Sequence, residues 1–125
     1  MARCSNRDRC HQVHRWLRSE YPTKKGTRLR VVARMPAEHG GNESDGVIVF
    51  EPASLPPLIY INASRSRSTM VYAVLHEYAH GLLVDRHPRD WDAVRHSDPF
   101  YRLLGILERR FFEANPTGER ESRDA

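Results

Sequence analysis

The chain has 125 residues, of which 39% are hydrophobic and 29% charged, a composition typical of one folded domain and not of a disordered protein. No apolar run approaches the length that crosses a bilayer, so we expect no membrane partner and a cytoplasmic location. Only two cysteines are present, Cys4 and Cys10, which excludes a disulfide framework and a Cys-rich zinc ribbon.

The net charge of +4 is concentrated near the N-terminus. Residues 1–35 contain ten Lys or Arg but only two acidic residues, Asp8 and Glu20. A basic stretch of this kind can bind nucleic acid or another polyanion. A solvated, Arg-rich helix face is the commoner reason for such a pattern.

The first third of the chain predicts a helix and a strand. Residues 6–21 form an amphipathic helix that ends at Pro22, because their apolar positions recur at spacings of three and four. These positions are Cys10, Val13, His14, Leu17 and Tyr21. Residues 29–35 alternate between apolar and mostly basic side chains up to Pro36, which predicts a half-buried strand. Residues 37–45 are rich in Gly, Asn and Ser and predict a loop.

The rest of the chain predicts two more strands and two long helices. Residues 47–50 and 58–61 are short β-prone runs separated by a Pro-rich connection. Serines at 64, 66 and 68 offer N-caps for a central helix that ends before Pro88. Its apolar stripe consists of Val71, Val74, Leu75, Tyr78 and Leu82. Residues 97–114 form a last amphipathic helix, and residues 119–125 form a charged tail, so we expect a single domain over residues 1–118.

The central helix carries the sequence His76-Glu77-Tyr78-Ala79-His80. Residues four apart lie one turn apart on the same helix face, so His76 and His80 can present two imidazole nitrogens to one metal ion. Glu77 lies beside them and can accept a proton from a water that the metal activates. This pattern predicts metal-assisted hydrolysis, with Zn²⁺ as the metal.

A catalytic zinc needs a third protein ligand and one open position. The sequence offers four candidates: His87, His96, Glu108 and Glu113. We favour His96, because it lies just before the last helix, which can hold it rigidly. A second zinc site at the N-terminus is another hypothesis, but its candidate ligands do not match a known finger spacing. These candidates are Cys4, Cys10, His11 and His14.

The stretch from Leu58 to Leu104 resembles the SprT-like zinc metallopeptidases and related small phage and bacterial metallopeptidases. The shared features are a strand, the His-Glu-x-x-His helix, and a His-x-x-x-Phe pattern that opens an amphipathic helix. The resemblance implies that His76, His80 and His96 bind zinc and that Glu77 is the general base. Ser97 stands where the family usually has Gly, and the chain has no C-terminal Cys-rich ribbon.

These observations predict an α+β, zincin-like domain with an N-terminal helix, a small three-stranded sheet, the active-site helix and a C-terminal helix. The expected activity is hydrolysis of peptide bonds in a protein or peptide by a zinc-activated water, with Glu77 as the base. By resemblance, an edge strand, either 47–50 or 58–61, pairs with the substrate backbone. The group that stabilises the oxyanion stays open between Tyr72, Tyr101 and Arg95. The alternative is a basic nucleic-acid-binding module with a structural or inactive metal site.

Overall fold

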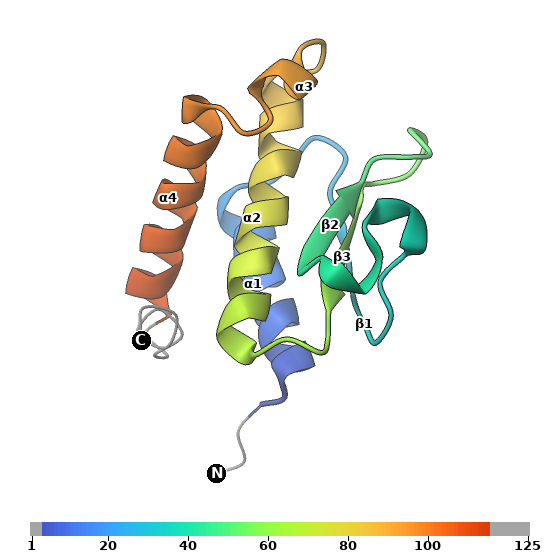
Figure 1. The fold of residues 1–125 in the computed structure, drawn as a ribbon. Helices are drawn as coiled ribbons and strands as arrows, with labels where there is room; N and C mark the ends of the chain where they lie inside the picture. Colours follow the sequence, from blue (N-terminus) through green and yellow to red (C-terminus); the bar gives the residue numbers. More distant parts are fainter. Residues whose placement is uncertain (1–3, 116–125) are drawn as a thin grey trace.

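The computed structural model describes residues 4–115, except for the side chains of Trp91 and Ala93. It is an α+β fold with a small three-stranded sheet, as expected (Figure 1). Its elements in chain order are α1 (Asn6–Glu20), β1 (Arg28–Val32), the 3-10 turns η1 (Ala37–His39) and η2 (Gly41–Glu43), β2 (Gly46–Val49), β3 (Leu58–Asn62), α2 (Arg67–Arg86), α3 (Trp91–Val94) and α4 (Asp98–Ala114). The expected tail, residues 119–125, and the expected domain end at residue 118 lie outside the described residues.

The sheet has the strand order β1-β3-β2. The first strand runs parallel to β3, whereas β2 runs antiparallel to it, and Ile59 in the middle of β3 is opposite Leu29 on one side and Ile48 on the other. The sheet is therefore mixed, and β3 is its central strand. Of the two strands proposed to border a substrate, β2 is the one at an edge.

The helix α2 is the centre of the core. It contacts α1, α4, β2 and β3, and Figure 1 shows it between α4 and the sheet with α1 behind it. The expected apolar stripe is buried, and so are residues around much of the rest of the helix, including Ala79, which is 0% exposed. Among the described residues, no helix is both long and apolar enough to span a membrane.

The structure differs from the sequence prediction at the end of the first strand and in one short helix. The first strand ends at Val32 and not at Met35, because the backbone N–H of Met35 donates to the Asn42 side chain, 2.9 Å away, instead of continuing the sheet. Met35 is still buried, which explains why the alternating pattern extended to it. The short helix α3 was not predicted, since four residues are too few to show a helical period.

A buried amide holds the start of β2 in place. Asn62, at the end of β3, is 0% exposed, and its side-chain nitrogen donates to the carbonyl oxygens of Asn42 and Ser44 at 3.2 and 3.0 Å. Arg65 adds an ion pair to Asp45, with Nε 2.7 Å from Oδ1. These bonds join the loop before β2 to the segment that leads into α2. The edge strand and the central helix are thus held in a defined relative position.

Replacing Tyr78 by Phe tests how strongly α2 is tied to the end of α1. The Tyr78 ring is fully buried and its hydroxyl donates to the Tyr21 carbonyl oxygen at 2.6 Å. Losing this bond leaves a carbonyl without that donor, so we expect Tyr78→Phe to lower the free energy of unfolding by about 1–1.5 kcal/mol. Chemical denaturation measures it. The control Tyr101→Phe changes an exposed ring and should change stability by less than about 0.5 kcal/mol; equal effects would contradict this account.

Candidate metal centre

The motif residues lie on one face of α2. The Nε2 atoms of His76 and His80 are 3.2 Å apart, and their ring centroids are 4.9 Å apart. Two nitrogens that bind one zinc at about 2.1 Å in a tetrahedron are about 3.4 Å apart. The two imidazoles therefore already have the separation that a shared metal requires.

The third imidazole comes from the connection between α3 and α4. The ring centroid of His96 lies 4.9 Å from that of His80 and 5.8 Å from that of His76. Ligand atoms of the three side chains all lie within 4.8 Å of one another, so these residues could hold a metal ion. The expected ligand trio is brought together, whereas the identity of the metal is not determined by this geometry.

Phe100 supports all three rings. It is 0% exposed and stacks on His80, with centroids 4.2 Å apart and planes 14° apart. It also makes edge contacts with His76 and His96 at centroid distances of 5.1 and 5.4 Å. The first turn of α4 thus packs Phe100 against the candidate ligands, and the residues just before this helix supply the third of them, His96. The sequence signal for this arrangement was the His-x-x-x-Phe pattern.

The other candidate ligands lie elsewhere. His87 follows the last residue of α2, and its Nδ1 lies 3.5 Å from a carboxylate oxygen of Asp90. Glu108 lines a hollow that also borders His76 but is not one of the convergent ligands, and Glu113 lines a depression between α1 and α4. Within residues 4–115, no second group of His, Cys, Asp or Glu converges as a metal site would. The N-terminal zinc hypothesis therefore has no support among these residues.

Burial sets the protonation of the site. Burial, followed by the charges of His76, His96 and Arg95, lowers the pKa of His80 to about 3, so its imidazole is neutral at neutral pH. Burial also raises the pKa of Glu77 from 4.5 to about 7, and a hydrogen bond from the Ile48 backbone opposes that rise. Glu77 Oε2 lies 3.9 Å from His76 Nε2. The arrangement combines the neutral imidazole of His80, which can bind a cation, with a carboxyl group suited to proton transfer near pH 7.

The contact between Ile48 and Glu77 was not predicted. It is made by a backbone N–H of β2, and a main-chain donor leaves no mark on residue identity. The only sequence signal was indirect: the β-prone run at 47–50 had been named as one of two strands that could border the site.

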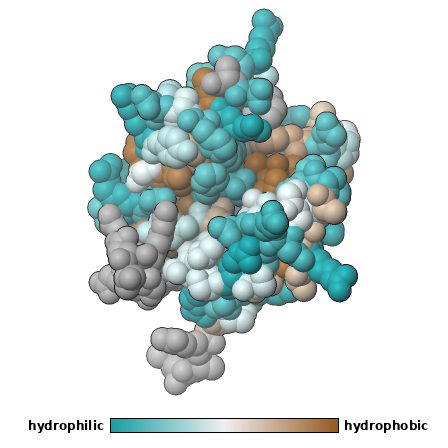
Figure 2. Space-filling model, viewed as in Figure 1, coloured by the Kyte–Doolittle hydropathy of each residue, from teal (hydrophilic) through white to brown (hydrophobic). Residues whose placement is uncertain are grey.

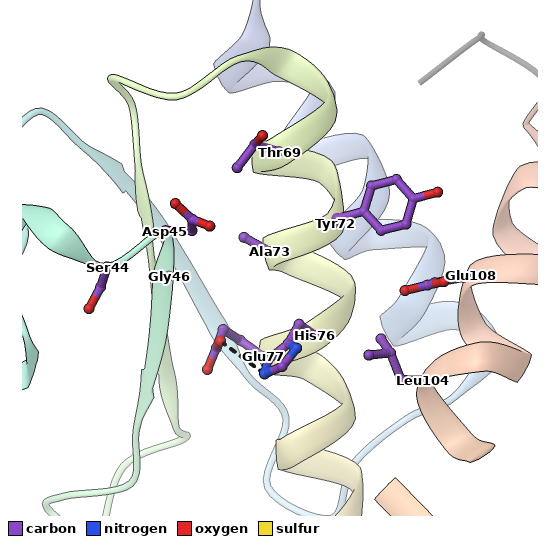
Figure 3. A pocket seen from close by; sticks show the side chains of 10 residues that line it. All are labelled: Ser44, Asp45, Gly46, Thr69, Tyr72, Ala73, His76, Glu77, Leu104 and Glu108. Carbon is purple, nitrogen blue, oxygen red and sulfur yellow. Dashed lines mark ion pairs between the residues drawn. The ribbon is translucent and has the colours of Figure 1, made fainter. Parts of the chain in front are cut away.

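Two connected hollows surround the candidate ligands. The first, of about 340 Å³, is lined by the three histidines, Glu77, Arg95 and residues of β2. The second, of about 450 Å³, shares Gly46, His76 and Glu77 with the first and extends between β2 and α4 (Figure 3). Figure 2 views the same face, with hydrophobic surface near its middle and hydrophilic surface around it. The face of α2 between β2 and α4 is thus a recess with the imidazoles in it.

Removing each histidine tests the metal site. We expect His76→Ala, His80→Ala and His96→Ala each to lose most of the bound zinc, because the remaining two ligands cannot complete the site. His87→Ala is the matched control and should retain it. Zinc content per chain and zinc affinity, measured on identically purified proteins, give the answer. A site that survives without His96 would contradict the three-histidine assignment.

Comparison with known proteins returned no relative. No family model matches the chain, and no curated protein or solved structure matches it significantly. The geometry of the site is therefore the basis for a proposed function.

Proposed function

We propose that this protein is a zinc-dependent metallopeptidase of the zincin type that the SprT-like family represents. The observation that carries the proposal is the convergence of three imidazoles beside the buried carboxyl group of Glu77. A structural zinc site is closed by four protein ligands, whereas a catalytic site has three and keeps one position for water. Among the described residues, the convergent group consists of three. This ligand count favours a catalytic site.

The chemistry follows from the placement of Glu77. Zinc at this site would supply a Lewis acid that lowers the pKa of water towards neutrality. Glu77 lies beside the ligand His76, where it can accept the proton of the attacking water. Its burial favours the protonated carboxyl group, so Glu77 can then donate that proton to the leaving amine.

The edge strand β2 supports a peptide as the substrate. One side of β2 pairs with β3, and its residues Val47 and Ile48 line the hollow that contains the imidazoles. A strand at the edge of a sheet can pair with an extended peptide through its main chain, while neighbouring hollows receive alternate side chains. The hollow between β2 and α4 lies next to Glu77 and offers such space (Figure 3). An extended protein segment or peptide fits this surface.

Glu77→Gln is the decisive variant. The amide cannot accept the proton from water, so we expect kcat/KM for peptide hydrolysis to fall by about 10²–10⁴-fold while zinc binding is retained. A fluorogenic peptide library assayed with zinc-loaded protein measures the loss. Glu113→Gln is the matched control, because Glu113 is exposed and lines a depression between α1 and α4, outside both hollows at the candidate ligands. Full activity in Glu77→Gln would refute the proposed role of the base.

One observation favours the alternative, a nucleic-acid-binding module. Arg7, Arg15 and Arg18 lie on the exposed side of α1, and their positive charges all act on His11 to lower its pKa. In the part of the chain that the structure describes, these three arginines make no ion pair. A phosphate backbone could bind such a stripe.

Salt dependence separates the two functions. If the alternative holds, duplex DNA should bind with an affinity that falls steeply as salt rises, since phosphate contacts release counterions. Binding should survive Glu77→Gln and be lost when Arg7, Arg15 and Arg18 are all replaced by Gln. The peptidase proposal is replaced by this alternative only if the zinc-loaded protein also cleaves no peptide.

A further inference from the structure

Hydrolysis of a peptide bond needs a donor for the oxygen that becomes negative. When the oxygen of water bonds to the carbonyl carbon, the electron pair of the C=O double bond moves onto the carbonyl oxygen. Groups aimed at that developing charge stabilise the transition state more than the bound substrate. The three histidines are committed as candidate ligands and Glu77 as the base. A further side chain with N–H or O–H groups at the cavity can add to this stabilisation.

Arg95 is the basic side chain at the site. Of the described residues that line the two connected hollows, it is the one Lys or Arg. It directly precedes His96 in the chain, so the same backbone segment carries the third imidazole and the guanidinium group. The charge of Arg95 also acts on His80, whose pKa it helps to lower. Arg95 therefore lines the same cavity as the three candidate ligands.

The backbone that carries Arg95 is restrained, but its side chain is only weakly held. Ser97 closes the turn by donating to the Val94 carbonyl oxygen from both its hydroxyl and its backbone N–H, at 2.6 and 3.1 Å. Among the described residues, Arg95 forms an ion pair with Asp92, but the contact is long, with Nη1 3.9 Å from Oδ1, and both side chains are more than half exposed. Arginine has five N–H donors, so such a contact leaves donors for a substrate. Because its backbone is restrained and N–H donors are available, the Arg95 side chain is suited to bind a reacting atom of the substrate.

The two tyrosines that the sequence also offered are placed less well. Tyr72 lines the hollow on the α4 side and not the one that contains all three imidazoles, and its ring packs on Phe112 at 5.3 Å. Tyr101 is 55% exposed and lines a different surface depression on α4. Its ring lies nearly parallel to that of His96, with centroids 6.4 Å apart. Neither hydroxyl shares the cavity of the ligand trio.

We propose that Arg95 donates hydrogen bonds to the scissile carbonyl oxygen as that oxygen becomes negatively charged; this inference rests on the proposed peptidase function. When the C–N bond breaks, the electron pair on the oxygen re-forms the C=O bond, and the amine nitrogen takes the proton from Glu77. Arg95 is thus a catalytic residue that binds the transition state, with no part in proton transfer.

The test uses the full chain loaded with zinc, in the variants Arg95→Ala, Arg95→Gln and Arg95→Lys. With a peptide blocked at both ends, we expect Arg95→Ala and Arg95→Gln to lower kcat by about 10²–10³-fold and to change KM little, as for the loss of one oxyanion donor. Arg95→Lys keeps the charge and should recover part of the rate. Arg89→Ala is the matched control, since Arg89 is exposed and lines neither hollow. Its rate should equal that of wild type.

Binding measurements give a readout that does not depend on turnover. A phosphinic peptide carries a tetrahedral, negatively charged group that resembles the transition state, and calorimetry measures its affinity for each zinc-loaded variant. We expect Arg95→Ala to weaken this binding by about tenfold or more. The affinity for zinc itself should be unchanged. Binding of the blocked peptide to a Glu77→Gln protein should be equally insensitive to Arg95→Ala.

Three results would overturn the inference. An unchanged kcat in Arg95→Ala would mean that no catalytic donor had been lost. A rise in KM confined to peptides with a free carboxylate would make Arg95 a receptor for that carboxylate. Weaker zinc binding in parallel with the lower rate would mean that Arg95 acts by positioning His96. If the wild type cleaves no peptide at all, the proposed function fails, and the phosphinic peptide still reports whether Arg95 binds a tetrahedral anion.

Discussion

The central helix α2 has to bury most of its surface and still bring ionisable side chains to one point. Charged imidazoles cannot be buried cheaply without a partner, but neutral ones can. The burial that packs α2 against its neighbours also keeps His80 neutral, and a neutral imidazole is the form that binds a metal ion. The packing of α2 and the ability of His80 to bind a metal ion are therefore two consequences of one arrangement. Burial disfavours a positive charge on the imidazole of His80 itself, whereas a bound cation would place a positive charge next to it.

Small residues bring the edge strand close enough to take part. A Cβ at Gly46 would lie 3.3 Å from the Cβ of Ala73, and one at Gly81 would lie 3.3 Å from the end of the Ile48 side chain. Without side chains at these two positions, β2 can lie directly against α2. This close approach places the backbone N–H of Ile48 at the carboxyl group of Glu77. The electrostatics of Glu77, the proposed base, thus depend on packing between residues that carry no charge.

The features that could be predicted from the sequence are those set by neighbouring residues along the chain. The helix that carries His76 and His80 follows from a spacing of four residues, and His96 was favoured because an apolar helix follows it. The order of the strands could not be predicted, since pairing between β1 and β3 joins segments distant in the chain. The end of β1 was misplaced, because the buried side chain of Met35 continued the pattern after its backbone had left the sheet. The cavity with Arg95 in its wall could not be predicted, because it depends on the positions of β2 and of the connection between α3 and α4 relative to α2.

The third candidate ligand, His96, lies in a short connection and not in one of the long helices. His96 lies between the short helix α3 and the start of α4, and its position relies on the Ser97 turn and on Phe100 beneath it. A metal ion shared with His76 and His80 would join this segment to α2 directly. Because such an ion binds the assembled ligands and not the unfolded chain, its binding free energy would add to the stability of the folded state. The same contact would hold Arg95 at the cavity, so metal binding and the placement of the proposed oxyanion donor would be achieved together.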